Sequence, residues 1–312
     1  MTALSQRTDL SRRRGTTPRR PGGRRRGKAW VGLLFTLPAL VPYVLFVLRP
    51  LVTSVQYSLY DWNGIGVARF VGLDNYRTVL TSSDELVPLL HAFELIGFFT
   101  VIPVVLGLIT AALLHGLPDG PLARTARVVL FIPQVIPLVA AALAWSWMYS
   151  SNGVLNQILR AVGLGDQSRA WLGDFTWAFP AVGIIGSWVL LGLCTLLLMT
   201  GINKIDPALY DAAEVDGAGP VQKFFAVTLP GLRREIGVCV TVTVIAALAS
   251  FDVVYVTTQG GPGTQTMVPG LEIFQLAFTQ RTVGLASANA IVLMVLVLLV
   301  VTPLQRLSKG AE

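Results

Sequence analysis

Four polar or aromatic residues lie in stretches that are otherwise strongly apolar, and their chemistry suits contact with the hydroxyl groups of a solute. They are Asp252, Tyr255, Asn289 and Trp147. An ionisable group in such surroundings is costly and is a functional hypothesis by default, so Asp252 is the first candidate. Tyr255 and Asn289 would add hydrogen-bonding groups, and Trp147 an aromatic face. The alternative interpretation is that Asp252 braces a helix end near water.

The lysines do not fit a nucleotide-binding loop of the G-x-x-x-x-G-K-[ST] type, in which backbone N–H groups cradle phosphates. The four that fail this pattern are Lys28, Lys204, Lys223 and Lys309. His91 and His115 are far apart and belong to no metal-ligand cluster. No serine lies in a G-x-S-x-G elbow. We therefore predict no catalytic, cofactor-binding or metal site, and any energy for transport must come from another polypeptide.

The composition places the chain in a bilayer. Of its 312 residues 53% are hydrophobic and only 13% are charged, and the mean hydropathy is +0.65. Water-soluble domains carry about 25% charged residues. A helix needs about 20 mostly apolar residues to cross the hydrocarbon core. We predict an all-α polytopic membrane protein with about six spans, at residues 29–48, 93–114, 128–149, 179–200, 236–257 and 284–303.

Basic residues predict how these spans are oriented. Residues 1–28 form a basic arm, which we expect to be disordered, followed by a membrane domain over residues 29–305 and a short tail over 306–312. Positive charge beside a span favours the cytoplasmic side, so both termini are predicted to be cytoplasmic. Binding of the arm to DNA or anionic lipid is a less favoured alternative. A signal peptide is disfavoured, because the first apolar run is too long and lacks a cleavage site.

The segment 206–230, predicted to be cytoplasmic, is more strongly patterned than a simple connector. Asp206 followed by Pro207 predicts a helix N-cap and a first helical residue. Residues 208–215 are mostly good helix formers. Gly217 and Gly219 should end this first short helix.

A second short helix is predicted to begin at Pro220 and to close at Pro230. Its apolar residues Val221, Phe224 and Phe225 would share one face. A helix-turn-helix of this kind, polar on one side and aromatic on the other, could dock into a groove of a partner protein. It could equally pack beneath its own helical bundle, and the physical pattern alone does not favour either alternative.

The run Asp211-Ala-Ala-x-x-Asp-Gly-Ala, followed by Val227-x-Leu-Pro230, resembles the EAA loop of ABC importer permeases. In that family the first short helix is the coupling helix, which sits in a cleft of the ATPase subunit. Asp211 stands where glutamate is usual in the family, and Val227 where isoleucine is common. Both replacements keep the chemical character of the side chain, acidic in one case and apolar in the other. The resemblance implies ATPase coupling for Tyr210, Asp211, Ala212, Ala213, Asp216, Gly217, Ala218, Phe224, Leu229 and Pro230.

Other motifs resemble the carbohydrate-uptake branch of the type I, MetI-like permeases, and its maltose or glycerol-3-phosphate type of first permease subunit in particular. They lie at residues 251–264, 61–64, 70–76, 153–156 and 171–174. The first of these reads Phe-Asp-Val-Val-Tyr-Val-Thr-Thr-Gln-Gly-Gly-Pro-Gly-Thr. The resemblance covers the chain from about residue 29 to its C-terminus.

This resemblance implies the activity and the partners. The chain would be a multi-pass subunit of a bacterial inner membrane, without enzymatic activity or a cofactor of its own. It would pair with a second homologous permease subunit and with two copies of a cytoplasmic ABC ATPase that uses the ATP. An extracytoplasmic solute-binding protein would deliver a sugar or sugar derivative. Membrane lipid is an expected partner, and nucleic acid is not.

Three alternatives remain open at this point. A permease of the same fold could carry amino acids, peptides or inorganic ions. An ion-coupled secondary transporter would need no ATPase and should carry coupling carboxylates near the bilayer midplane. A membrane-anchored receptor or scaffold would give no solute flux at all.

Overall fold

The computed structural model describes residues 25–118 and 120–309. Most of the predicted basic arm and the last residues of the predicted tail lie outside this described part. The chain divides into two units, Met1–Val52 and Thr53–Glu312. In the first unit helix α1 (Arg25–Tyr43) passes through a π-helical turn, η1 (Val44–Leu48), into α2 (Arg49–Tyr57), which continues into the second unit. The apolar stretch Leu34–Tyr57 is long enough to cross a bilayer, and it begins and ends later than the predicted span at 29–48.

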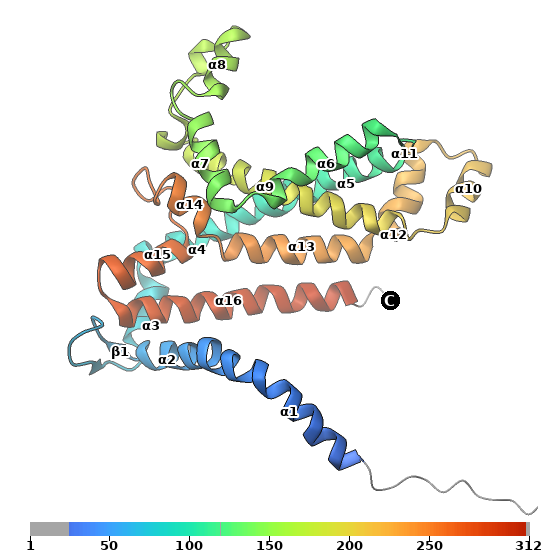
Figure 1. The fold of residues 1–312 in the computed structure, drawn as a ribbon. Helices are drawn as coiled ribbons and strands as arrows, with labels where there is room; N and C mark the ends of the chain where they lie inside the picture. Colours follow the sequence, from blue (N-terminus) through green and yellow to red (C-terminus); the bar gives the residue numbers. More distant parts are fainter. Residues whose placement is uncertain (1–24, 119, 310–312) are drawn as a thin grey trace, which may run out of the picture. The chain divides into compact units, whose positions relative to one another are not determined.

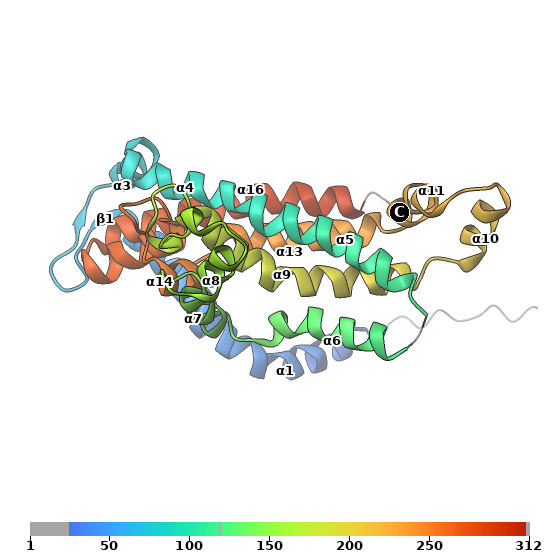
Figure 2. The same cartoon turned by 90° about the horizontal axis from the view of Figure 1, so that it is seen from above.

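Three spans of the second unit match three predicted ones. The first, Ser83–His115, joins α4 (Ser83–Ile96), the π-helical turn η2 (Gly97–Val101) and α5 (Ile102–His115). The others are α9 (Ala178–Ile202) and α16 (Val283–Lys309), of which Val283–Arg306 is the apolar part. The predictions at 93–114, 179–200 and 284–303 fall within these helices. Figures 1 and 2 show α5, α9, α13 and α16 running alongside one another.

The predicted span at 128–149 is not a straight helix. Helix α6 (Pro121–Val135) and helix α7 (Leu138–Met148) meet at an angle of 102°. The backbone between them is extended, with ψ of 129° at Ile136 and 134° at Pro137. Proline disfavours a helical conformation in the residue before it, which places the bend at this pair. Pro133 stays inside α6, so the bend follows that helix and lies at Ile136 and Pro137.

The predicted span at 236–257 is also interrupted. Helix α13 (Arg233–Leu248) ends before Ala249, and a new short helix, α14 (Asp252–Thr257), begins after Phe251. Phe251 has φ of −144° and ψ of −61°, which is not helical. Within the described residues there are therefore four helices long and apolar enough to cross a membrane, or five if α6 and α7 count as one span. The described helices therefore account for fewer spans than the roughly six predicted from the sequence, and six passages of the chain remain a prediction.

Glycines on α9 allow neighbouring backbones to approach closely. A Cβ added to Gly186 would lie 2.0 Å from the Phe99 ring, and one added to Gly192 would lie 2.4 Å from the Leu130 carbonyl oxygen. Two further small residues lie at contacts between helices. Gly107 packs on Cys194, and the Ser187 hydroxyl donates a 2.8 Å hydrogen bond to the Phe98 carbonyl. Small residues thus set the distance between α9 and its neighbours.

One end of the second unit, here called the α14 end, carries short elements that hold the helix ends together. They are β1 (Tyr60–Asp61), β2 (Arg69–Phe70), α3 (Asp74–Thr81), α15 (Pro269–Phe274) and the π-helical turn η6 (Gln275–Thr279). The strands are antiparallel, with Tyr60 opposite Phe70. The Asn75 amide donates to the carbonyls of Ser58 and Tyr60, and the Gly284 N–H donates to the Trp62 carbonyl. The motif at 70–76 therefore ties α3 to the segment 58–62, which in turn bonds to the start of α16.

A buried amide joins the parts of the loop after α7. It contains α8 (Val154–Ala161) and the 3₁₀ turns η3 (Gly165–Gln167) and η4 (Trp171–Gly173). The Asn156 side chain is fully buried and donates to the carbonyls of Ser150 and Arg169. Its oxygen accepts from the Trp171 indole N–H at 2.9 Å. Because these bonds join both arms of the loop, the motifs at 153–156 and 171–174 act together.

The opposite end of the second unit, here called the α10 end, is formed by the segment between α9 and α13. It contains α10 (Pro207–Val215), α11 (Pro220–Lys223), the π-helical turn η5 (Phe224–Thr228) and α12 (Leu229–Gly231). Figure 1 shows α10 extending beyond the ends of α5 and α9.

Candidate functional site

The first helix of the α10 end begins where the sequence predicts. The Asp206 carboxylate accepts a 2.9 Å hydrogen bond from the Ala208 N–H, and Pro207 is the first helical residue. An N-cap of this kind satisfies a backbone donor that the helix itself cannot. The helix therefore starts at a fixed residue although none of its side chains is buried.

Gly217 makes the turn behind α10. Its φ is +79°, a conformation that side chains with a Cβ adopt only at a cost. The Ala218 N–H bonds back to the Ala213 carbonyl at 2.9 Å and closes the turn. The next helix begins at Pro220, and the Gln222 side chain accepts from the Gly219 N–H.

The second helix is longer than predicted. It continues from α11 through η5 and α12 to Gly231, so that Pro230 lies inside it and does not close it. The Pro230 ring is tolerated because the preceding π-helical turn shifts the hydrogen-bond pattern and because Pro230 lies in the first turn of α12. Only Leu232 separates this helix from α13.

Two side-chain contacts brace α10 against the second helix. The Lys223 ammonium lies 2.6 Å from the Glu214 carboxylate, and the Tyr210 hydroxyl lies 3.0 Å from the Thr228 hydroxyl. The bonded ammonium holds the pKa of Glu214 below its usual value. The His115 ring at the end of α5 packs on the Tyr210 ring at 5.9 Å. The loop is thus tied both to itself and to the bundle.

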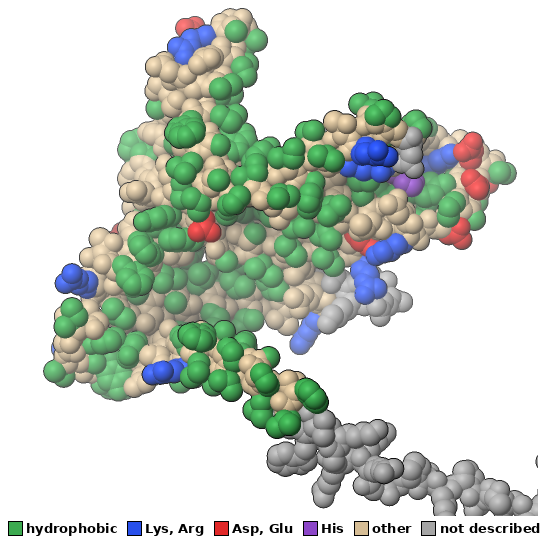
Figure 3. Space-filling model, in the orientation of Figure 1, with side chains coloured by type: hydrophobic (Ala, Val, Ile, Leu, Met, Phe, Trp, Pro, Cys, Tyr) green, Lys and Arg blue, Asp and Glu red, His purple; other side chains and the backbone are tan. Residues whose placement is uncertain are grey.

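The outward side of this braced loop is exposed and carries apolar groups. Val215 is 87% exposed and Phe225 61%, whereas Phe224 is half-buried and packs edge-to-face on the Phe225 ring. The residues of the predicted coupling set that are exposed are Asp211, Ala212, Asp216, Gly217 and Pro230. Figure 3 shows acidic side chains gathered over α10 and basic ones beside them. This mixture of apolar and charged groups suits contact with another protein.

A second feature is a hollow of about 230 Å³ at the interruption between α13 and α14. Asp252 lines it, together with Ser250 and Phe251 from the interruption itself. Phe99 of η2, Leu138 of α7, and Gly186, Val189 and Leu190 of α9 complete most of its wall. The break in the helix therefore places a carboxylate and non-helical backbone beside a mostly apolar hollow.

Aromatic rings form a continuous cluster beside Asp252. The rings of Phe251 and Tyr255 stack at 5.2 Å with an interplanar angle of 15°, and both contact Phe274. Phe274 contacts Phe278, which is 73% exposed. The sequence pattern pointed to Tyr255 but not to the three phenylalanines, because Phe274 and Phe278 reach this place from α15 and η6. Nothing in their spacing indicates this.

The other two proposed pathway residues are not brought to this hollow. Asn289 is fully buried in α16, where its amide bonds to Glu85 of α4, and it does not line the hollow. Trp147 is 75% exposed on α7 and does not line the hollow. The sequence signal places all four residues in apolar segments but carries no information on which way each one faces.

Comparison with known proteins identifies the fold. Residues 103–309 match the family model described as "binding-protein-dependent transport system inner membrane component". The chain is 32% identical over 90% of its length to 83% of the diacetylchitobiose uptake system permease protein NgcF of Streptomyces coelicolor. It is 34% identical over 87% of its length to 91% of the trehalose/maltose transport system permease protein MalF of Thermococcus litoralis.

A solved structure has the same architecture. A chain of a bacterial alginate ABC transporter, in complex with an alginate pentasaccharide-bound periplasmic protein, superposes with a TM-score of 0.79. The match covers 91% of the present chain and 96% of that chain at 21% sequence identity. The family match spans more than half of the present chain and includes the α10 end and all residues that line the Asp252 hollow except Phe99. The chain therefore belongs to the family of binding-protein-dependent transport system inner membrane components, the permease subunits of ABC transporters.

Proposed function

We propose that this chain forms, with a second permease subunit, the pathway by which an ATP-driven importer takes up a sugar or sugar derivative. The names of two relatives, for diacetylchitobiose and for trehalose or maltose, support the substrate class. So does the combination of a carboxylate with aromatic rings in and beside the hollow at Asp252, since sugars present both hydroxyl groups and apolar ring faces.

The braced loop at the α10 end is the single observation that carries this proposal. Its exposed face and its ties to Thr228 and His115 suit an element that receives a push from outside and passes it into the bundle. A cytoplasmic ATPase would grip α10, and closure of two ATPase copies would move two such loops together. The bundle would then alternate between two conformations whose populations depend on nucleotide.

The solute would pass along the hollow lined by Asp252. Asp252 would accept hydrogen bonds from hydroxyl groups, and the exposed faces of Tyr255 and Phe278 would stack against a sugar ring. Because Asp252 lies at the first turn of α14, it is placed by the break at Phe251 and not by a continuous helix.

The remaining assignments follow from this function. The α10 end and both termini would be cytoplasmic, in a bacterial inner membrane, and the α14 end would face the solute-binding protein. The chain would cross the membrane six times if α13 and the bent α6–α7 pair each complete a passage. The chain itself would hydrolyse no ATP and bind no cofactor.

A co-purification experiment tests the coupling loop. The chain is expressed with its ATPase and its sister permease and is purified in mild detergent. Gly217→Asp should reduce the recovered ATPase about tenfold or more, because a Cβ strains the +79° turn and the new charge lies beside the docking face.

Gly163→Asp is the matched control. Gly163 has φ of +83° and, like Gly217, no atom within 4 Å of an added Cβ, but it lies in the loop after α8. The Gly163→Asp variant should leave the amount of recovered ATPase unchanged. Full recovery of the ATPase with Gly217→Asp would contradict the assignment of this loop.

A transport experiment separates the alternatives. Proteoliposomes with all subunits and the solute-binding protein should accumulate sugar only with ATP and a functional ATPase. Asp252→Asn should lower uptake about tenfold without loss of ATPase binding, whereas Asp166→Asn, an exposed carboxylate of the loop after α8, should not. Uptake driven by an ion gradient without the ATPase would favour a secondary transporter, and uptake of amino acids or peptides would refute the sugar assignment.

A further inference from the structure

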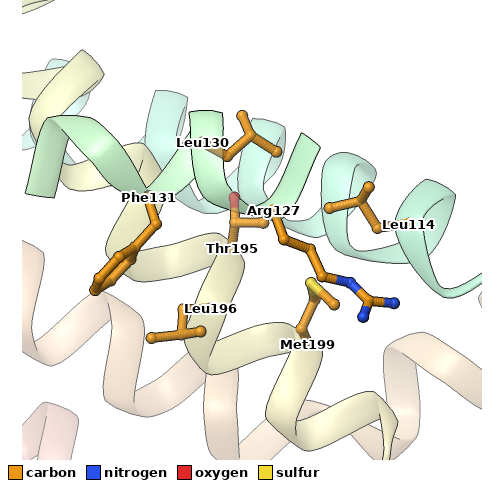
Figure 4. Close-up of a pocket in the computed structure, with 8 residues that line it drawn as sticks. Leu114, Arg127, Leu130, Phe131, Thr195, Leu196 and Met199 are labelled. Atoms are coloured by element: carbon orange, nitrogen blue, oxygen red, sulfur yellow. The ribbon is translucent and has the colours of Figure 1, made fainter. Parts of the chain in front are cut away.

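Two hollows of the second unit differ in size and in the groups that line them. The smaller one, of about 70 Å³ between α5, α6 and α9, has Phe131 on its wall and the Arg127 side chain extending beside Met199 (Figure 4). The larger one, of about 340 Å³, lies at the α14 end and is lined by Asp84 and Glu272; it is here called the acidic hollow. Pockets that hold organic groups are usually of about 300 Å³ or more, so only the acidic hollow has room for one.

Three segments form the wall of the acidic hollow. The start of α4 contributes Asp84, α15 contributes Glu272, and the loop before α15 contributes Met267. The Nδ1 atom of His91 lies 2.8 Å from the Met267 carbonyl oxygen and so ties that loop to α4. A wall that is already fixed lowers the cost of ordering on binding.

The Glu272 carboxylate of this hollow has no partner within the described part of the chain. The residue is only 8% exposed, and no hydrogen bond or ion pair from a described residue reaches its carboxylate. Two other acidic residues, Asp84 and Glu85, lie close enough to affect its ionisation. No lysine, arginine or histidine is among the described residues that line the hollow, and Arg281, the basic residue nearest to Glu272 in sequence, is exposed and does not line it. Because a buried carboxylate without a donor is costly, a cationic group here would be stabilising.

The acidic hollow suits an organic cation better than a metal ion. Calcium in proteins takes about six to eight oxygen ligands at roughly 2.3–2.6 Å, which requires a tight shell. The described residues contain no group of three or more His, Cys, Asp or Glu side chains that could hold a metal ion. The hollow instead has room for a long side chain, whose methylene groups would contact Val87, Pro88 and Met267. Carboxylates beside apolar surface match the two parts of an arginine or lysine side chain.

We propose that the acidic hollow receives an arginine or lysine side chain of the extracytoplasmic solute-binding protein, which docks on the α14 end. The cationic head would lie between the carboxylates of Asp84 and Glu272, and the Gln275 side chain would offer a further acceptor. The occupant is a protein because the family is that of binding-protein-dependent transport components and the hollow carries charge of one sign only. This docking rests on the proposed function, in which the α14 end faces the solute-binding protein.

The two carboxylates would have different parts in this docking. Asp84 is exposed and would attract the cationic side chain from solution, which mainly speeds association. Glu272 is buried and would hold the side chain once it is inserted. Since a charge pair shielded from water contributes more to affinity than one at an exposed rim, Glu272 should matter more than Asp84.

Binding is measured on the complete complex, with the sister permease and the ATPase, in lipid nanodiscs titrated with the solute-binding protein. Glu272→Gln keeps the shape of the side chain but removes its charge, and it should weaken binding about tenfold. Asp84→Asn should weaken binding only about threefold, because water screens this exposed charge. Raising the salt from about 50 mM to about 500 mM should weaken binding to the wild type more than binding to Glu272→Gln.

Asp74→Asn is the matched control. Asp74 is an exposed carboxylate of α3, at the same α14 end, but it does not line the acidic hollow. The Asp74→Asn variant should bind the solute-binding protein like the wild type.

A double-mutant cycle identifies the inserted side chain. Each surface arginine and lysine of the solute-binding protein is replaced by alanine in turn. One of these replacements should weaken binding to the wild-type complex about tenfold and leave binding to the Glu272→Gln complex almost unchanged.

Equal binding by the wild type and by Glu272→Gln, in a variant that still melts cooperatively, would overturn the proposal. So would a loss in Asp74→Asn as large as that in Glu272→Gln. If Ca²⁺ alone raised the melting temperature of the wild type and not that of Glu272→Gln, the hollow would hold a metal ion instead. These three outcomes leave the importer assignment intact, whereas a wild-type complex that binds no solute-binding protein would contradict the proposed function itself.

Discussion

The side-chain amide of Asn289 donates a 2.7 Å hydrogen bond to the carboxylate of Glu85, and both residues are buried. The bond joins α16 to α4 across 204 positions of sequence. Glu272, from α15, is a further buried carboxylate near them, close enough that Glu85 affects its ionisation. The α14 end is therefore held by polar groups that are shielded from water, where a lost partner is costly.

Removing the amide should destabilise the protein. Asn289→Ala leaves the Glu85 carboxylate without its donor, at a cost of about 1–3 kcal/mol, and should lower the melting temperature in detergent. Glu85→Gln keeps an oxygen that accepts the same bond and should cost less. The control is Asn152→Ala, at an exposed position in another loop. An Asn289→Ala protein as stable as the wild type would mean that the bond contributes nothing.

Glu272 predicts a pH dependence of stability. Burial, and then the charges of Glu85 and Asp84, raise the pKa of Glu272 from 4.5 to about 7. In the unfolded chain the same carboxyl titrates near 4.5. Between these values the folded protein keeps a proton that the unfolded chain has lost, so stability falls as pH rises through this window and levels off above it.

The measurement is a series of melts in detergent from about pH 5 to about pH 8. The wild type should melt at a higher temperature at the acidic end of the series. Glu272→Gln, which mimics the protonated form, should remove much of this dependence of melting temperature on pH. Asp166→Asn, at an exposed site, should show the same dependence as the wild type. If Glu272→Gln and wild type have parallel profiles, the carboxyl does not titrate in this range.

The contact between α9 and η2 predicts a difference between two glycines. Gly186→Ala would push a methyl group into the Phe99 ring, whose nearest atom lies 2.0 Å from the added carbon, and should destabilise by about 1–3 kcal/mol. Gly97→Ala is the control within η2 itself, since nothing lies within 4 Å of its added carbon. The measurement is the melting temperature of each variant. Equal melting temperatures for Gly186→Ala and Gly97→Ala would show that α9 and η2 can move apart without cost.

The buried amide of Asn156 should hold the loop after α7. Asn156→Ala removes a donor to Ser150 and Arg169 and an acceptor for the Trp171 indole, so residues 150–177 should become sensitive to protease. Limited proteolysis with mapping of the cut sites measures this. Asn152→Ala, exposed in the same loop, should retain wild-type resistance, and a resistant Asn156→Ala protein would refute the role.

Local rules in the sequence predicted several elements correctly. The N-cap at Asp206, the turn at Gly217 and the start of a second helix at Pro220 depend only on neighbouring residues, and the structure has all three. The long apolar helices α9 and α16 are equally local, because a run of apolar residues satisfies its own backbone whatever packs against it. The membrane class and the family resemblance needed no tertiary information.

Those local rules did not predict where a span is interrupted or which way a polar side chain faces. The sequence predicted one span at 128–149, where the structure has two helices that meet at 102°. No residue type signals the break at Phe251, which tertiary packing must hold in place. Hydropathy treats Asp252 and Asn289 alike. One lines a hollow and the other is sealed against Glu85, because the neighbours that decide this come from helices far away in sequence.

Composition and contacts a few residues apart were therefore enough to predict that the chain crosses a membrane, where its predicted cytoplasmic loop turns and which family it resembles. The packed helices were needed to show which polar groups face a cavity and that Phe274 and Phe278 join Tyr255. This division arises because helix packing sets the surroundings of a side chain, and packing brings together residues whose separation along the chain carries no local signal.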